Sequence, residues 1–363
     1  MSVIDYFSAT YAEARAGFLE SCQALDLAVE HHAHPQRGRE GEELATDVAR
    51  IGPADASHVF ITMSATHGVE GFCGSGIQTG ALRSGLYDDL PGNVAVVLVH
   101  AINPWGFSWL RRVTHENVDL NRNHLDHGAG YPVNEGYERL RDAICPRQWS
   151  AEAQAATRAT FEAYAREHGA MALQAAISGG QYSDPRGLFF GGNALTWSAR
   201  TLAAVISRHA GNARHVGFVD YHTGLGPYGY GERISVHPTD DPGHGRLQAW
   251  LGADEITSTD DGTSASAALT GVNRLCVAGA APRASLTMLT LEFGTSPAEE
   301  VFDALRADCW LHNHGELDSD QGRAIKAEIR RCFYPDADDW KQAAWDRAID
   351  TERKMIDGLA PLD

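Results

Sequence analysis

The apolar positions of the chain form short, nearly continuous runs that alternate with longer segments of helical spacing. The stretches "HVFITMSAT" and "NVAVVLVHAIN" are rich in β-branched residues, which is typical of strands buried on both faces of a sheet. Between them, "GSGIQTGALRSGL" predicts a helix, so this region is a β–α–β unit. Three later stretches, "HVGFVDYHTG", "RISVHP" and "SLTMLTLEFG", predict further strands.

Helical patterns account for much of the remaining chain. "HPQRGREGEELATDVARIG" predicts a polar connector with a short strand, and "ISGGQYSDPRGLFFGGN" predicts a glycine-rich loop. No repeat or low-complexity linker stands out, so we expect one α/β domain with a mixed sheet and helices on both faces. Helices are predicted over residues 5 to 31, 134 to 175, 194 to 210, 297 to 312, 320 to 331 and 338 to 358.

Length and charge narrow the class of protein. The chain has 363 residues, of which 43% are hydrophobic, and this is enough to bury a large core. Its 48 acidic and 30 basic residues give a formal net charge of −18. Such a surface repels nucleic acid and anionic membranes, so neither is an expected partner. A small ligand is not excluded, because a local basic pocket can lie inside an acidic surface.

Targeting signals and cysteine pairs are missing from the sequence pattern. The segment "MSVIDYFSATYAEARAGF" lacks the basic and apolar regions of a signal peptide, and no run of about 18 apolar residues predicts a membrane span. The cysteines are scattered without a CxxC pair, which is typical of reduced, mostly buried thiols in a cytoplasmic protein. They are Cys22, Cys73, Cys145, Cys276, Cys309 and Cys332.

Candidate chemistry begins where the first of these strands ends, in "THGVEG". His67 and Glu70 lie three residues apart on a predicted turn, and imidazole and carboxylate are both good zinc ligands. Gly68 and Gly71 flank the pair and let backbone approach a ligand closely. Taken alone the pair is weak evidence, because such a spacing is usually an ordinary surface feature.

A catalytic zinc needs three protein ligands and one open position for water. The third candidate is His222 in "FVDYHTGLG", at the end of another predicted strand, where open α/β sheets place their sites. Alone, His222 is equally compatible with a histidine that caps a strand. Asp220, two residues earlier, is a candidate to orient it.

The segment "GFSWLRRVTHENVDLNRNHLDH" carries arginines beside asparagines in a loop-like region. Arginine presents a planar fork that suits a carboxylate or an oxyanion. The alternative is a solvated polar loop, but aromatic and apolar residues bound the segment rather than lysine and glutamate. Its polar residues include Arg111, Arg112, Asn117, Asp119, Asn121, Arg122 and Asn123.

Glu292 lies near the end of the predicted strand "SLTMLTLEFG", after seven residues without a charge. A buried strand rarely carries an unpaired carboxylate, because desolvating the charge is costly. A metal-bound water is one reason to keep it. Glu292 would then be the general base, which takes the water proton and passes it to a leaving amine.

Together these segments resemble the M14 zinc carboxypeptidase superfamily. They resemble most its DUF2817 branch, whose members carry "HGVEG", "NPWGF…RR…ENVDLNRN", "HTGLGPYG" and "EFGT" much as they stand here. The resemblance extends over most of the chain. It implies a single zinc carboxypeptidase-like (phosphorylase/hydrolase-like) α/β domain over residues 1–363, with a mostly parallel mixed sheet and a helical, glycine-rich insertion near 130–210.

The resemblance also implies an activity and a role for each candidate residue. The chain would be a zinc metallohydrolase with one Zn²⁺, cleaving an amide bond next to a free carboxylate. Its substrate would be a small peptide or, alternatively, an N-acyl amino acid, as in aspartoacylase-type deacylases. The roles fall to His67, Glu70 and His222 for the metal, Arg112 or Arg111 for the oxyanion, Asn121 and Arg122 for the carboxylate, and Glu292 for the water.

Several alternatives stay open at this point. Residues 130 to 210 are interpreted as a lid or as the contact of a homo-oligomer. A nucleophilic hydrolase could use Cys73 or Ser75 in "GFCGSG", although Cys73 replaces the first glycine of Gly-x-Ser-x-Gly. An inactive binding module on the same fold is the third class. The tyrosine that covers the pocket in digestive carboxypeptidases is not placed, since Tyr228 and Tyr230 follow His222 too soon. Histidines interpreted as structural or loop residues are His115, His124, His127, His312 and His314.

Overall fold

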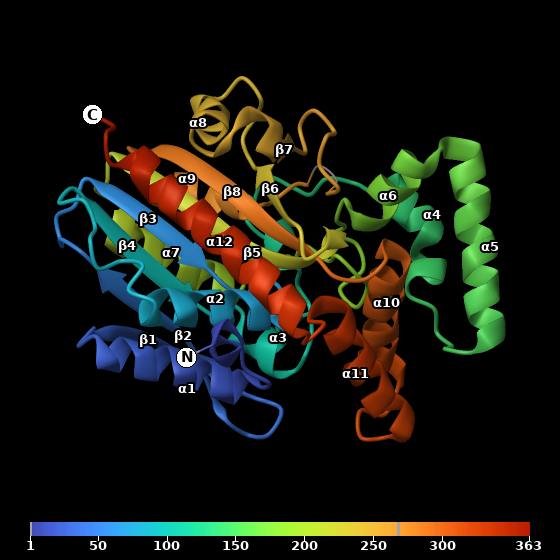
Figure 1. Ribbon diagram of the computed structural model, residues 1–363. Coiled ribbons are helices and arrows are strands. Elements are labelled where there is room, and N and C mark those ends of the chain that lie inside the picture. The colour runs from blue at the N-terminus through green and yellow to red at the C-terminus, as the bar shows by residue number, and fades with distance from the viewer. Residues whose placement is uncertain (1, 267–268) are drawn as a thin grey trace.

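A mixed sheet of eight strands forms the centre of the computed structural model, which describes residues 2–266 and 269–363 (Figure 1). The strand order is β1-β2-β4-β3-β5-β8-β6-β7. The four central strands β4, β3, β5 and β8 are parallel, whereas β2 and β6 run antiparallel to their inner neighbours. The strands are β1 (Val29–Arg37), β2 (Glu43–Ile51), β3 (His58–Met63), β4 (Val94–His100), β5 (His215–Tyr228), β6 (Gly231–Ser235), β7 (Ile256–Ser258) and β8 (Ser285–Gly294).

Helices make up most of the rest of the described chain. No helix within residues 2–266 and 269–363 has the length and apolar character needed to cross a membrane. The α-helices are α1 (Tyr11–Ala24), α2 (Gly71–Arg83), α3 (Pro104–Ser108), α4 (Glu135–Ile144), α5 (Ala151–His168), α6 (Ala170–Ser178), α7 (Trp197–Ala210), α8 (Pro242–Leu251), α9 (Asn273–Ala280), α10 (Ala298–His314), α11 (Asp320–Phe333) and α12 (Asp338–Leu359). Short 3-10 turns are η1 (Val3–Tyr6), η2 (Gly68–Glu70), η3 (Leu120–Arg122) and η4 (Ala253–Glu255).

Helices cover both faces of the sheet (Figure 1). One face packs against α1, α2, α8 and α12 through a core that includes Phe72, Tyr221 and Trp340. The opposite face packs against α7 and α9 through residues such as Leu202 and Phe218. Strand residues alternate between these two cores, as the two-residue period of a strand requires. The expected α/β fold, with a mostly parallel sheet between helical layers, is confirmed.

A third group of helices lies beyond one end of the sheet. Helices α4, α5, α6, α10 and α11 stand together on the right of Figure 1. They share a separate apolar core that includes Tyr137, Ala176, Leu305 and Ile329. The helices predicted over residues 134 to 175 are therefore present, as three separate elements that pack on the C-terminal helices.

The single helix expected over residues 5 to 31 is wrong at both ends. The α-helix begins only after Thr10, whose side chain accepts a hydrogen bond from the Glu13 N–H. It ends at Ala24, and Asp26 then adopts a left-handed backbone with φ of 52°. The chain beyond enters β1, an edge strand, where Pro35 needs no ladder hydrogen bond.

The strand expected within the polar connector after residue 33 is present as β2, but the connector itself is wrong, because the segment also supplies the end of β1 and forms most of a β1–β2 hairpin. Burial of β2 between β1 and β4 selects the strand despite its acidic and small residues. The sequence pattern also missed α8, α9 and β7. The last is a three-residue strand at the sheet edge, too short to leave a periodic signal.

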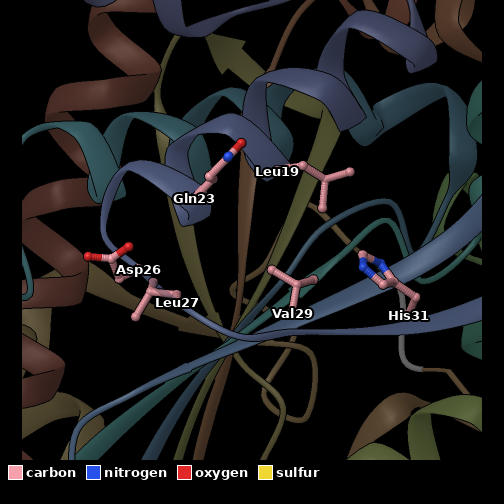
Figure 2. Close-up of a pocket in the computed structure, with 6 residues that line it drawn as sticks. All are labelled: Leu19, Gln23, Asp26, Leu27, Val29 and His31. Carbon is pink, nitrogen blue, oxygen red and sulfur yellow. The ribbon is translucent and has the colours of Figure 1, made fainter.

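A hollow of about 440 Å³ lies between α1 and the edge strand β1 (Figure 2). Its lining shares no residue with the larger cavity described below. Asp26 and His31 are its only charged or titratable residues, and neither belongs to a group that could hold a metal among the described residues. We assign no chemistry to it. It is lined by Leu19, Gln23, Asp26, Leu27, Val29 and His31.

A buried carboxyl group on α12 makes the stability of the fold depend on pH. Glu352 is fully buried and accepts hydrogen bonds from the hydroxyl groups of Tyr87 and Tyr221. Burial raises the pKa of Glu352 to about 7, because neither tyrosine offers a compensating positive charge. In the unfolded chain the same group titrates near its ordinary value of about 4.3.

We therefore expect Glu352→Gln to stabilise the protein at neutral and basic pH relative to acid. The folded-state pKa is raised, so ionisation of Glu352 costs nothing below about pH 4 and progressively more between about pH 4 and 7. The free energy of unfolding of the variant minus that of the wild type should grow over this window by up to about 3 kcal/mol. Urea unfolding of both proteins from pH 4.5 to 8.5 measures it. A difference that stays constant with pH would contradict the assignment.

Candidate metal centre

The carboxyl ends of β3, β5 and β8 bring the predicted residues together. Met63 at the end of β3 pairs with Asp220 on β5, and His222 on β5 pairs with Glu292 on β8. Beyond β3 the chain turns through His67 into η2. Parallel strands end at one edge of the sheet, so residues far apart in sequence converge there.

The glycines beside His67 and Glu70 are required by the chain itself. A Cβ on Gly68 would lie 1.9 Å from the backbone carbon of Gly106, and one on Gly71 would lie 2.6 Å from the Phe107 ring. The backbone N–H of Gly68 donates to the Arg112 carbonyl. The close approach that these glycines allow is therefore to α3 and not to a ligand, and it fixes η2 against the arginine segment.

His67, Glu70 and His222 form a group that could hold a metal ion, with their ligand atoms within 4.8 Å of one another. The Nδ1 of His67 lies 2.9 Å from Glu70 Oε1, and the Nδ1 of His222 lies 3.1 Å from Glu70 Oε2. The two Nδ1 atoms are 3.1 Å apart. All three side chains are buried, so two imidazoles and a carboxylate face one point away from bulk solvent.

Two aspartates hold the outer ring nitrogens of the histidines. His67 Nε2 lies 3.1 Å from Asp119 Oδ1, and His222 Nε2 lies 2.7 Å from Asp220 Oδ2. Each contact directs the Nε2 proton outward and leaves Nδ1 free to face the common point. Asp220 in turn accepts hydrogen bonds from Thr66 and from the side chain of Asn273. The expected contact between Asp220 and His222 is present.

Of the two neighbouring arginines, Arg112 lines the cavity. Its Nε donates to Asp119 at 2.9 Å and its Nη1 to Glu70 at 3.1 Å. Arg111 points elsewhere, donating to Asp308 at 2.9 Å and to Asn117 at 3.2 Å. Asp308 also pairs with Lys326, so Arg111 belongs to a buried ion network that ties the loop to α10 and α11.

Asn121 and Arg122 lie side by side on η3 and both line the same cavity. Arg122 pairs with Asp119 at 3.2 Å and donates to the Ser178 carbonyl at 2.6 Å. The ring of Phe189 lies under the guanidinium groups of both Arg112 and Arg122, with centroid distances of 5.4 and 5.3 Å. The cationic groups are thus held in place by stacking as well as by charge.

Glu292 is buried in the same cavity, and no lysine or arginine among the described residues forms an ion pair with it. Its Oε1 accepts a hydrogen bond from the Leu225 N–H at 3.0 Å. Burial and the neighbouring charge of Glu70 raise the pKa of Glu292 to about 7. A carboxyl group with such a pKa can both accept and return a proton near neutral pH.

The cavity has a volume of about 900 Å³ and extends in two directions from the metal group. One part is bounded by α5, α6 and α10, with Phe161, Leu173 and Phe302 among its apolar residues. The other part is bounded by β5, β6, β8 and the start of α9. This volume suits a small molecule or the end of a peptide.

The competing nucleophile candidates lie outside the cavity. Cys73 is buried in α2, and burial raises the pKa of its thiol well above the ordinary range, which disfavours the reactive thiolate. Ser75 Oγ lies 2.8 Å from His100 Nε2, but neither residue lines the cavity. The remaining histidines and tyrosines singled out in the sequence are likewise absent from its described lining: His115, His124, His127, His312, His314, Tyr228 and Tyr230.

Sequence reasoning missed the roles of three residues in this region. Asp119 stood in the arginine segment but carried no sign that it joins His67, Arg112 and Arg122. Asn273 and Phe189 lie in segments without periodic patterns, and each reaches the site through long-range packing. No local signal could have identified them.

Comparison with solved structures supports the fold. Bovine thrombin-activatable fibrinolysis inhibitor, solved in complex with tick carboxypeptidase inhibitor, aligns over 99% of this chain and 99% of its own, with 11% identity and a TM-score of 0.50. A metallo-carboxypeptidase from Pseudomonas aeruginosa aligns over 98% and 71%, with 13% identity and a TM-score of 0.43. Succinylglutamate desuccinylase from Chromobacterium violaceum aligns over 88% and 74%, with 14% identity and a TM-score of 0.39. At these identities the first match shows a shared fold and no more.

Sequence comparison identifies the family. The search of curated protein sequences gave no significant match. The sequence model of the family described as "Protein of unknown function (DUF2817)" matches residues 7–347, which is most of the chain. The chain therefore belongs to the DUF2817 family, and it has the fold of the M14 zinc carboxypeptidases.

Proposed function

We propose that this protein is a zinc-dependent hydrolase that cleaves an amide bond next to a free carboxylate. The observation that carries the proposal is the convergence of His67, Glu70 and His222 on one point, in a cavity that also holds the unpaired Glu292. A metal group, a candidate base and two arginines in one cavity are the parts that metal-assisted amide hydrolysis requires.

The charges around the site fit a divalent cation. Four buried carboxyl groups meet only two guanidinium groups, which leaves an excess of two negative charges when the imidazoles are neutral and Glu292 is ionised. One divalent ion balances that excess, and the two-histidine, one-carboxylate set favours zinc. When bound, zinc polarises the scissile carbonyl and lowers the pKa of a water. The charged groups are Glu70, Asp119, Asp220 and Glu292 against Arg112 and Arg122.

Residues of the chain carry out proton transfer, stabilisation of the oxyanion and binding of the substrate carboxylate. Glu292 takes the proton of the attacking water and returns it to the leaving amine, which its pKa of about 7 allows in both directions. Arg112 stabilises the negative charge that develops on the carbonyl oxygen. Asn121 and Arg122 bind the carboxylate of the substrate and so place the scissile bond beside Glu292.

The acyl side of the bond separates a carboxypeptidase from a deacylase of N-acyl amino acids. A long peptide needs an open groove, whereas an acyl group fits a closed pocket. Gln174 on α6 donates to the Ala265 carbonyl at 3.1 Å, which joins the helical segment to the loop before α9. Both residues line the cavity, so this contact narrows it. A narrower cavity suits a small acyl group better than a long peptide, so the deacylase is the second candidate function.

The test is product release, measured by mass spectrometry from a mixed panel of peptides and N-acyl amino acids. Each reaction is run with zinc and with a chelator. Release of single C-terminal residues that the chelator abolishes supports a carboxypeptidase. Turnover of N-acyl amino acids alone supports the deacylase and a closed acyl pocket. Hydrolysis that survives complete removal of metal would overturn the proposed function.

A further inference from the structure

Two arginines that line the cavity, Arg158 and Arg274, have no part in the hydrolytic chemistry described above, and only Arg274 lies next to the proposed carboxylate site. Arg274 lies in the first turn of α9 and lines the cavity, with its side chain 25% exposed. Its Nη2 donates to Asp241 at 3.2 Å. Its Nε is buried without an acceptor among the described residues. Most of the five N–H donors of this guanidinium are therefore unused, although it lies in a cavity.

The residue before Arg274 connects it directly to the proposed carboxylate site. The backbone N–H of Asn273 donates to Asn121 Oδ1 at 3.3 Å, and its side chain donates to Asp220 at 2.7 Å. The His124 N–H donates to the Gly271 carbonyl at 3.0 Å. The start of α9 is thus packed on the segment that carries Asn121 and Arg122. The backbone of Arg274 therefore lies next to the residues that are proposed to bind the α-carboxylate of a substrate.

The far end of Arg274 is fixed beside β6. Its partner Asp241 caps α8 and also accepts from the Gly243 N–H at 2.7 Å, and it lies 3.1 Å from the Nδ1 of His237. The His237 Nε2 accepts a hydrogen bond from the Met288 N–H on β8. The side chain of Arg274 therefore runs from the carboxylate site toward the end of β6 and the first half of β8. Asp241 accepts from several donors at once. It therefore fixes the position of the guanidinium while most of the guanidinium N–H donors stay available.

The cavity surface along this path is otherwise mostly apolar. Phe218, Ile234, Val236 and Met288 line it. Phe218 lies on the same face of β5 as His222, and Met288 on the same face of β8 as Glu292, because strand residues alternate between the two faces. This part of the cavity combines room for methylene groups with a single guanidinium that has free donors.

We propose that Arg274 determines specificity, by binding the side-chain carboxylate of an acidic amino acid on the leaving side of the scissile bond. The inference rests on the proposed function and names its substrate class, compounds that end in glutamate or aspartate. Arg122 and Asn121 bind the α-carboxylate, and Arg274 binds the second carboxylate through its free Nη donors. Paired charge-assisted hydrogen bonds from arginine discriminate a carboxylate from its amide and from an alkyl group.

The test measures binding and hydrolysis separately. Binding of N-benzoyl-L-glutamate, N-benzoyl-L-glutamine and N-benzoyl-L-leucine is measured by isothermal titration calorimetry in the Glu292→Gln protein, where hydrolysis does not interfere. The kcat/KM of the same compounds is measured with Glu292 intact. Each set is repeated with Arg274→Gln, with Arg274→Lys and with Arg283→Gln, an exposed arginine outside the cavity that serves as the control. Circular dichroism checks the fold of each variant.

We expect the glutamate compound to bind about 10- to 100-fold more tightly than the glutamine compound, the range of a charge-assisted hydrogen bond. Arg274→Gln should remove this preference, Arg274→Lys should retain part of it, and Arg283→Gln should leave it intact. Equal binding of the three compounds, or a preference that survives Arg274→Gln, overturns the proposal. A preference that depends on Arg274 without any hydrolysis supports the binding site and contradicts the proposed function instead. Hydrolysis of all three compounds at similar kcat/KM supports the proposed function and overturns the role of Arg274.

Discussion

Glu292→Gln is expected to reduce hydrolysis by about 10²- to 10⁴-fold, the usual contribution of a general base. Glutamine has nearly the same shape, and its carbonyl oxygen can still accept the Leu225 N–H. It cannot take a proton from water near neutral pH. Glu292 is also not one of the three residues in the metal group, so zinc content should be unchanged. The variant separates loss of the base from loss of the metal.

Glu299 provides a matched control for this experiment. It lines the same cavity at the start of α10, is exposed, and is not in the metal group. Glu299→Gln removes one negative charge from the cavity and should change kcat by less than about threefold, as surface substitutions usually do. Initial rates and zinc content are measured for both variants on whichever compound the substrate panel identifies. A Glu292→Gln protein with wild-type kcat would show that another group accepts the proton.

Much of the fold could be predicted because its strands are buried on both faces. The runs around β3 and β4 are nearly continuously apolar, and a run of that kind leaves few alternatives. One charged residue could be recognised for the same reason. Glu292 follows uncharged positions that give no other reason to keep a carboxylate, whereas His67 and His222 are weak candidates alone and become candidates for a metal site only together with Glu70.

The elements that escaped prediction are those whose structure depends on distant partners. The edge hairpin of β1 and β2 forms because β2 pairs with β4 in the sheet, and not because its residues favour strands. Helix α9 is eight residues long and follows a low-periodicity segment. Its start is placed by two hydrogen bonds, from the Asn273 N–H to Asn121 Oδ1 and from the His124 N–H to the Gly271 carbonyl. Arg274, which sits on it, could not be assigned to the site from sequence.

The choice between Arg111 and Arg112 illustrates a limit of reasoning from spacing alone. The two residues are adjacent in an irregular segment, so neither a helical nor a strand period assigns them to a face. Leu110 just before them has a positive φ of 50°, which redirects the chain. Which arginine faces the cavity is decided only by the acidic residues with which the two arginines pair. Asp308 on α10 holds Arg111, and Asp119 holds Arg112 toward the cavity.

Replacement of one residue of the metal group is expected to have the largest effect of all. His222→Ala should lower bound zinc from about one ion per chain to a small fraction of that, because a structural or catalytic site rarely holds zinc with two protein ligands. Hydrolysis should be lost with it. In the wild type, zinc at 100 times its Kd should stabilise the fold by about 2.7 kcal/mol, and this gain should vanish in the variant.

The measurements are zinc content by inductively coupled plasma mass spectrometry and the unfolding temperature with and without zinc. His100→Ala is the matched control. His100 is as buried as His222 and stacks on Phe18, but it lies outside the metal group. It should lower stability through lost packing while leaving zinc content unchanged. Equal zinc loss in both variants would indicate unfolding rather than loss of a ligand.

Zinc that remains bound to folded His222→Ala would place the ion elsewhere. Among the described residues the only other candidate group is Glu300, Glu328 and Cys332. Arg331 already pairs with both carboxylates, at 2.7 Å each. Burial raises the pKa of Cys332 to about 11, so its thiolate is scarce at neutral pH. Cys332→Ser should therefore retain zinc, and loss of zinc in that variant would move the metal site away from the cavity.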